Sequence, residues 1–222
     1  MNKIIKESFK DSLPIMAGYL VLGSGFGMMC TTYDYSIFVA ISMSLFIYAG
    51  SMQYVALSLL SSGASLLSAF IMTVVVNIRH LFYGISMFNK YHDLKKHKFY
   101  IIFSLTDETF SIVSSKKDKD GDYYFYLSLF NQLYWLIGTI LGFLIGDRLP
   151  FSTSGIEFSM TALFICVVVD NLEKNKDYLP TIGGFLIAII CLLIFGTSNF
   201  LVPSILFITL FLIILGKVRR AI

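Results

Sequence analysis

The chain has 222 residues, of which 56% are hydrophobic and only 14% are charged, and its formal net charge is +3. Because soluble domains carry about a quarter charged residues, this composition excludes an ordinary soluble domain and predicts an all-α, polytopic membrane protein embedded in a lipid bilayer. The lysines and arginines stand in short clusters between apolar runs, as in membrane-protein loops. No nucleic-acid partner is therefore expected.

Eight apolar segments follow one another, and each is a candidate for a spanning helix, which needs roughly 20 mostly apolar residues. The fourth and sixth are short, so we expect a helical bundle of seven or eight spans. The chain is interpreted as one membrane domain over 1–222, with a polar tail over 1–12, the bundle over 13–215 and a basic tail over 216–222. The segments are Leu13–Thr32, Ser36–Leu60, Ala64–Phe88, Phe99–Ser115, Tyr123–Gly146, Gly155–Val169, Leu179–Phe195 and Phe200–Leu215.

The orientation of this bundle stays open. Basic clusters are usually retained in the cytoplasm, so the two basic tails predict an even number of crossings with both ends inside. That arrangement would place the basic sequence DLKKHK outside, unless one of the first three segments is re-entrant. The stretches LVLGSGFGMM and LIGTILGFLIG, in the first and fifth segments, either indicate two weakly related halves or arise by chance.

The second segment has polar residues in the middle of a charge-free run. Gly50, Ser51 and Gln53 weaken the helix there, since glycine costs about 1 kcal/mol in a helix interior. A break would expose backbone N–H groups, and the N-terminus of the following half-helix would suit a ligand carboxylate. We therefore expect these three residues to contact a ligand. Gly23 and Gly27 mark either another break or a close-packing surface, and packing is the preferred interpretation.

The third segment places Arg79 and His80 within apolar sequence. Asn77, His80 and Gly84 are spaced i, i+3, i+7 and share one helix face, so Asn77 and His80 are expected to contact the ligand. Arg79 points elsewhere, and it either anchors the helix at the interface by snorkelling or is buried in a pair. Its separation from Lys90, about 15 Å along a helix, favours burial.

The fourth segment carries the opposite charge, in Asp107 and Glu108. A charge at the bilayer centre costs about 2.5–3.5 kcal/mol even on insertion scales, so a partner is expected. We predict that Asp107 pairs with Arg79, while Glu108, about 100° away on a helix, carries a proton with His80 as a relay. The two acids could exchange these roles. In the alternative interpretation, Asp107 only neutralises Arg79 to stabilise the bundle.

Four of these stretches resemble the motifs of one family. YAGSMQYVAL, NIRHLFYG, TDETF and GIEFSMTALF are similar, in order and spacing, to segments of AzlC-type permeases, over about Phe9 to Asp170. One departure is Glu157, where the family frequently has Asp. The resemblance implies the large subunit of an exporter of leucine, isoleucine, valine and, in some members, methionine. It also implies coupling to the proton-motive force, a small membrane partner of the AzlD type, and the bacterial cytoplasmic membrane.

Two other functions stay open. A Ser51/His80 dyad on different segments would suit an intramembrane hydrolase, and the chain could instead be a non-catalytic channel or assembly subunit. The sequence contains no G-x-x-x-x-G-K-[ST] nucleotide motif. Its cysteines, Cys30, Cys166 and Cys191, lie in apolar runs and form no CxxC pair. We therefore expect a secondary transporter rather than an enzyme, with no cofactor and no metal.

Overall fold

The structure is a computed structural model, and the regular elements among the residues it describes are all α-helices, as predicted. The chain divides into two units, Met1–Met160 and Thr161–Ile222, each with its own internal packing. The described residues are 2–92, 94, 96–116, 119–148, 165, 169, 172–173 and 178–221.

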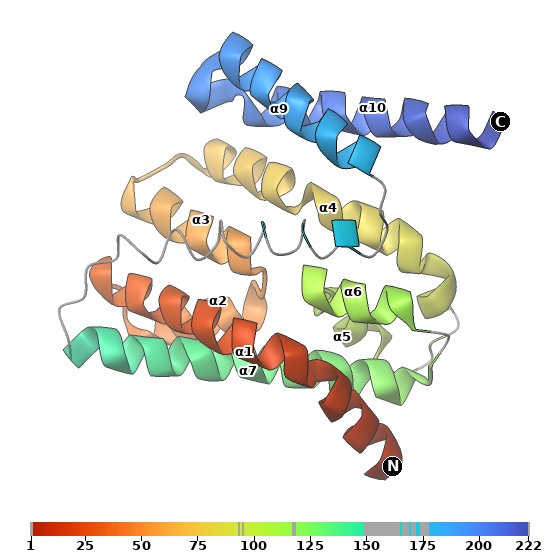
Figure 1. Cartoon of the computed structure of the whole chain (residues 1–222). Helices are drawn as coiled ribbons and strands as arrows, with labels where there is room; N and C mark the ends of the chain where they lie inside the picture. Colours follow the sequence, from red (N-terminus) through yellow and green to blue (C-terminus); the bar gives the residue numbers. More distant parts are fainter. Residues whose placement is uncertain are drawn as a thin grey trace. The chain divides into compact units, whose positions relative to one another are not determined.

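Two long helices, α1 (Asn2–Thr32) and α7 (Gly121–Arg148), lie side by side in the first unit (Figure 1). They run in the same direction, because Phe9 contacts Phe130 near one end and Gly146 approaches Met28 near the other. α1 begins well before Leu13, the start expected from hydropathy, so the polar residues of 1–12 are helical too. That predicted helix start was wrong.

Ion pairs explain why the polar first turns of α1 are ordered. Lys116 Nζ lies 2.7 Å from Asp11 Oδ2, and Lys119 Nζ lies 2.7 Å from Glu7 Oε1. The hydrogen bond from its ammonium group to Glu7 raises the pKa of Lys119. Both lysines follow the helix that precedes α7, so these contacts fasten the start of α1 to the connection leading into α7.

Glycines allow α1 and α7 to meet backbone to backbone. A Cβ added at Gly23 would lie 2.6 Å from Trp135 O, and one added at Gly138 would lie 2.8 Å from Leu20 O. Gly27 likewise faces the backbone of α7. The close-packing interpretation of Gly23 and Gly27 is therefore confirmed, and both glycines lie within one continuous helix rather than at a break.

The predicted second segment is two helices, α2 (Ile37–Phe46) and α3 (Gly50–Ser61), which confirms the expected break. The chain turns at Tyr48, whose φ of 39° is in the left-handed region. Within the described part of the chain, no side chain caps the start of α3 at Ala49. The first backbone N–H groups of α3 are therefore left for other partners.

A second break divides the predicted fourth segment into α5 (Lys98–Phe103) and α6 (Asp107–Ser115). One helix over Phe99–Ser115 was therefore a wrong prediction. The physical reason lies at Thr106, the N-cap of α6, whose Oγ1 accepts a hydrogen bond from Thr109 N at 3.3 Å. Two acidic residues in the first turn further favour a helix start there.

The long helix α4 (Leu66–His92) replaces the predicted Ala64–Phe88. Its C-terminal half packs with α5, α6 and α7 around one apolar cluster that includes Met87, Tyr91, Ile101 and Tyr124. From α4, Lys90 Nζ donates to Val113 O at 2.7 Å and to Lys116 O at 2.6 Å, which satisfies carbonyls at the C-terminal end of α6.

The second unit contains α9 (Tyr178–Asn199) and α10 (Leu201–Ala221), which pack against each other. Gly196, with φ of 71°, bends the chain near the end of α9. The expected sixth segment, Gly155–Val169, lies almost wholly outside the described residues, as does Glu157.

Four described helices are long and apolar enough to cross a membrane: Lys3–Thr32, Leu66–His92, Gly121–Arg148 and Tyr178–Gly196. Ile37–Phe46 and Leu206–Lys217 are shorter apolar helices. The class of an all-α membrane bundle with broken helices is thus confirmed. Seven or eight spans, two related halves and a single domain stay predictions.

Candidate substrate and proton site

Arg79 lies beside the N-termini of α3 and α6, the two helices that follow the breaks in the first unit. From α4, its Nη2 donates to Ser51 Oγ at 2.6 Å and lies 3.1 Å from Asp107 Oδ2. Ser51 is in the first turn of α3, and Asp107 is the first residue of α6. The side chains of Arg79 and Asp107 keep 27% and 20% of their surface accessible, so the pair is only partly buried.

This position gives Arg79 an unusual electrostatic environment. A helix N-terminus carries a partial positive charge, so the starts of α3 and α6 both disfavour a guanidinium and favour an anion. The Asp107 carboxylate offsets that repulsion. A second carboxylate arriving at Arg79 would meet a full positive charge and the uncapped N–H groups of α3 together.

Asp107 is held on its other side by a tyrosine of α4. Tyr83 OH donates to Asp107 Oδ1 at 2.7 Å, and the Tyr83 ring stacks on Phe110 with centroids 4.3 Å apart. His80 packs edge-on against Tyr83, with ring centroids 5.7 Å apart. Its Nδ1 faces Asn77 O at 3.3 Å. His80 therefore borders the pair through Tyr83.

Glu108 faces a different set of groups. Tyr19 OH, from α1, donates to Glu108 Oε2 at 2.6 Å and lies 2.6 Å from Thr106 Oγ1. Among the described residues, no lysine or arginine forms an ion pair with Glu108. Of the two adjacent acids, Asp107 is thus paired with a cation, whereas Glu108 is surrounded by hydroxyl groups.

Gly50 and Gln53 line the interior of the break between α2 and α3. A Cβ at Gly50 would lie 2.9 Å from Trp135 Cη2, so glycine is required for this close approach to the ring. Gln53 is fully buried, and its Nε2 donates to Ser44 Oγ at 3.3 Å. Ser44 Oγ lies 3.0 Å from Thr139 Oγ1. Gln53 therefore joins α3 to α2 and α7 rather than to Arg79.

The structure thus brings Ser51, Arg79 and Asp107 together, with His80 beside them, and places Gly50, Gln53 and Glu108 in the adjoining interior. Asn77 presents a buried Oδ1 that has no hydrogen-bond partner within the described residues. No hydrogen bond joins Ser51 to His80 in the same part of the chain. Roles in substrate binding and proton coupling stay predictions, because a contact alone tests neither.

Three contributors were given no role from the sequence: Tyr19, Tyr83 and Asn131, whose Nδ2 donates to Thr109 Oγ1 at 2.9 Å. Tyrosines are common in apolar spans and gave no signal. Asn131 stands beside Gln132 in the apolar run SLFNQLYW, and this pair of amides was a visible signal. Buried amides in a spanning helix need partners from other helices.

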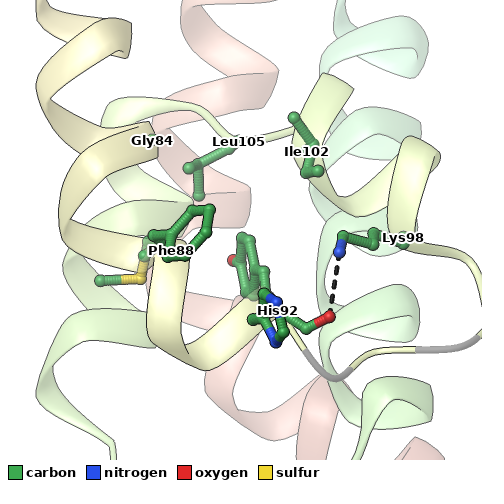
Figure 2. Close-up of a pocket in the computed structure, with 8 residues that line it drawn as sticks. Gly84, Phe88, His92, Lys98, Ile102 and Leu105 are labelled. Carbon is green, nitrogen blue, oxygen red and sulfur yellow. Dashed lines mark hydrogen bonds between the residues drawn. The ribbon is translucent and has the colours of Figure 1, made fainter.

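An apolar pocket of about 160 Å³ lies between α4 and α5, close to the site (Figure 2). Gly84 and Leu105 lie at one end, while Lys98 Nζ donates to His92 O at 3.0 Å at the other. Gly84 follows Tyr83, and Leu105 precedes Thr106, so the first end adjoins the residues that hold the two carboxylates. The remaining lining residues are Met87, Phe88, Tyr91 and Ile102.

Comparisons with known proteins agree with the motif resemblance. The family described as "AzlC protein" matches residues 14–149. An "Uncharacterized membrane protein" of Helicobacter pylori (strain J99) is 38% identical over 97% of this chain and 96% of its own length. The "Branched-chain amino acid transport protein AzlC" of Bacillus subtilis is 38% identical over 96% of this chain and 85% of its own length.

A more distant relative, the "Inner membrane protein YgaZ" of Escherichia coli, is 27% identical over 79% of this chain and 76% of its own length. No solved structure matches the chain. The matched region contains both helix breaks and every predicted site residue. The chain is therefore a multi-pass membrane protein that belongs to the AzlC family.

Proposed function

We propose that the chain is the large subunit of a secondary transporter that exports branched-chain amino acids and is driven by the proton-motive force. Membership of the AzlC family makes it a transport protein rather than an enzyme. The Bacillus subtilis relative, named a branched-chain amino acid transport protein, supports branched-chain amino acids as the substrate class. Leucine, isoleucine and valine are the proposed substrates, with methionine as a further candidate.

The proposal rests on one observation, which is that charged groups and an apolar pocket lie close together around Arg79. A zwitterionic amino acid needs a cation for its carboxylate, an anion for its ammonium and an apolar space for its side chain. Arg79 with the start of α3 supplies the first, and the carboxylates of Asp107 and Glu108 supply the second. The pocket beginning at Gly84 and Leu105 supplies the third.

The proposed sequence of contacts starts from competition at Arg79. An arriving substrate carboxylate takes the place of Asp107 on the guanidinium, with Ser51 and the first N–H groups of α3 as further donors. Asp107 is then released toward the substrate ammonium. Asn77 Oδ1 and His80, on the same helix as Arg79, are the proposed additional polar contacts to the substrate. Gly50 and Gln53 line the break between α2 and α3.

Glu108 is the proposed proton carrier, because its neighbours are hydroxyl groups rather than a fixed cation. Its charge can therefore change without leaving an unpaired arginine. His80 is the proposed relay, since an imidazole titrates near neutral pH.

A small membrane subunit of the AzlD type is the proposed partner, as the family resemblance implies. Co-purification of the two subunits from a membrane extract tests this partnership directly.

The decisive experiment measures efflux of leucine, isoleucine, valine and methionine from cells with and without the chain and its proposed partner. The Arg79→Gln variant tests the site, and Gly18→Ala serves as a matched control because Gly18 lies in open space on α1. We expect efflux with the parent and the control only. Equal efflux from cells lacking the chain would refute the proposal.

A channel is the alternative that this experiment must distinguish. A channel passes substrate only down its gradient, whereas a proton-driven exporter moves it uphill when a pH gradient is imposed. Reconstituted vesicles loaded with equal leucine on both sides separate these outcomes.

A further inference from the structure

A continuous hydrogen-bond chain begins at Glu108 of α6, passes through Tyr19 of α1, and returns through α6 to Asn131 of α7. Its first link is the 2.6 Å hydrogen bond from Tyr19 OH to Glu108 Oε2, and its second is the 2.6 Å contact between Tyr19 OH and Thr106 Oγ1. Thr106 Oγ1 then lies 3.0 Å from Thr109 Oγ1, and Asn131 Nδ2 donates to Thr109 Oγ1 at 2.9 Å.

Burial shields the members of this chain beyond Glu108, which is itself half-buried. Tyr19, Thr106, Thr109 and Asn131 are each at most 8% exposed, and Asn131 is fully buried. Water at the molecular surface therefore does not compete for their donors and acceptors. The proton positions are limited by the partners, because each hydroxyl group has a single proton to donate.

With Glu108 ionised, Tyr19 donates its proton to Glu108. Thr106, whose hydroxyl contacts both Tyr19 and Glu108, donates to one of these two oxygens. Thr109 must then donate to Thr106, and the Asn131 amide donates to Thr109. All the donors point toward the carboxylate, and such aligned hydrogen bonds strengthen one another.

With Glu108 protonated, the same heavy atoms accommodate the opposite arrangement. The carboxyl O–H donates to Tyr19, Tyr19 donates to Thr106, and Thr106 donates to Thr109. Thr109 then needs an acceptor, which a half-turn of the Asn131 amide provides by exchanging Nδ2 for Oδ1. Asn131 Oδ1 has no hydrogen-bond partner within the described residues, so it is available for that exchange.

We propose that this chain is a reversible switch, which keeps Glu108 hydrogen-bonded both with and without a proton and passes its state to the Asn131 amide of α7. One proton is bound from water, and the remaining changes are rotations of O–H bonds and of one amide. The inference rests on the proposed role of Glu108 as proton carrier. Tyr19 and Asn131 act as positioning residues for that proton.

Other groups also face Glu108. Tyr48, from the break between α2 and α3, and Tyr83, from α4, lie close enough for its charge to act on them, and Asp107 adjoins it on α6. Among the described residues, Tyr19 is the tyrosine whose hydroxyl donates directly to Glu108. Removing that hydroxyl therefore tests the chain more specifically than removing the others.

The test is an infrared titration of the full chain in lipid nanodiscs. The band of the protonated carboxyl group is followed against pH, and its loss in Glu108→Gln assigns it. In Tyr19→Phe the ionised form loses its nearest donor, so the midpoint should rise by about one to two pH units. Thr109→Val removes a link further along, and it should raise the midpoint by less.

Tyr134→Phe is the matched control, because Tyr134 OH is also buried and joins α7 to α1 through Ser12 Oγ at 3.0 Å, outside the chain. It should leave the midpoint unchanged. The switch predicts that the amide band of Asn131, assigned through Asn131→Leu, changes with the same midpoint in the parent and not in Thr109→Val.

An unchanged midpoint in Tyr19→Phe, an equal shift in Tyr134→Phe, or the absence of any band lost in Glu108→Gln would overturn the proposal. The titration requires no transport. A failure of the efflux experiment therefore leaves its outcome unaffected, and the two proposals can fail separately.

Discussion

Removing either Arg79 or Asp107 should cost about as much stability as removing both charges together. At the observed N–O distance of 3.1 Å and an effective dielectric constant of 20, two unit charges attract by about 5 kcal/mol. Solvent reaches both side chains, at 27% and 20% exposure, and reduces this value. We expect a coupling energy of about 2–3 kcal/mol, between the values of exposed and fully buried pairs.

A double-mutant cycle measures that coupling. Arg79→Met, Asp107→Asn and the double variant are unfolded in mixed micelles by increasing the fraction of ionic detergent. Each single variant should lose about 2–3 kcal/mol of unfolding free energy, and the double variant should lose less than the sum of the two. The reference is Lys116 with Asp11, which are 2.7 Å apart but include the more exposed Lys116 side chain, at 35%.

That reference pair should give a coupling energy of about 1 kcal/mol or less. A coupling for Arg79 and Asp107 no larger than the reference value would refute the reasoning. The charges would then be solvated separately, and the position of Arg79 between two helix starts would have no energetic importance.

Three further predictions concern the close packing of α1 on α7, the coupling of transport to protons and the apolar pocket. Gly23→Ala should lower the unfolding free energy by about 1–3 kcal/mol, because its methyl group meets the α7 backbone. Gly18→Ala should leave the unfolding free energy unchanged, because its methyl group meets nothing within 4 Å. Equal losses for the two variants in detergent unfolding would contradict the close packing of α1 on α7. Glu108→Gln should abolish leucine transport driven by a pH gradient in proteoliposomes while retaining leucine exchange, and persistent uphill transport would transfer the coupling role to Asp107. Gly84→Val adds volume in the open space beside the apolar pocket and should reduce leucine efflux relative to valine efflux by about tenfold; parallel losses for both would exclude this pocket as the side-chain site.

The two helix breaks show what local sequence does and does not specify. The break before Gly50 was predictable because glycine, serine and glutamine are poorly suited to the middle of an apolar helix. The break after Phe103 was missed, although Thr106 followed by two acidic residues is a helix-start signal. Polar residues spaced along one face of Phe99–Ser115 suggested a continuous amphipathic helix, and that periodicity concealed the N-cap.

The chemical types in the site could be predicted, but their neighbours could not. An arginine and two acids in apolar sequence must find partners, because the bilayer offers none. The contact of Glu108 with Tyr19 joins residues 89 positions apart, and no local periodicity indicates which helix lies beside which. That information comes from the glycine-mediated packing of α1 on α7, which fixes where Tyr19 and Asn131 stand.

The attachments of α6 differ in kind between its two ends. Its C-terminal end is held by Lys90, through the carbonyls of Val113 and Lys116, and by the pair of Lys116 with Asp11. Its N-terminal end is held through Asp107 and Glu108, whose contacts would change with substrate and with a proton.

The nine residues of α6 span about 13.5 Å. With the C-terminal end acting as a pivot, a displacement of about 1 Å at the other end requires a tilt of only about 4°. Both carboxylates belong to the first turn of this short helix, so a tilt that moves Asp107 away from Arg79 also moves Glu108 relative to Tyr19. In the proposed function, substrate exchange and proton exchange would thereby be linked mechanically through the first turn of α6.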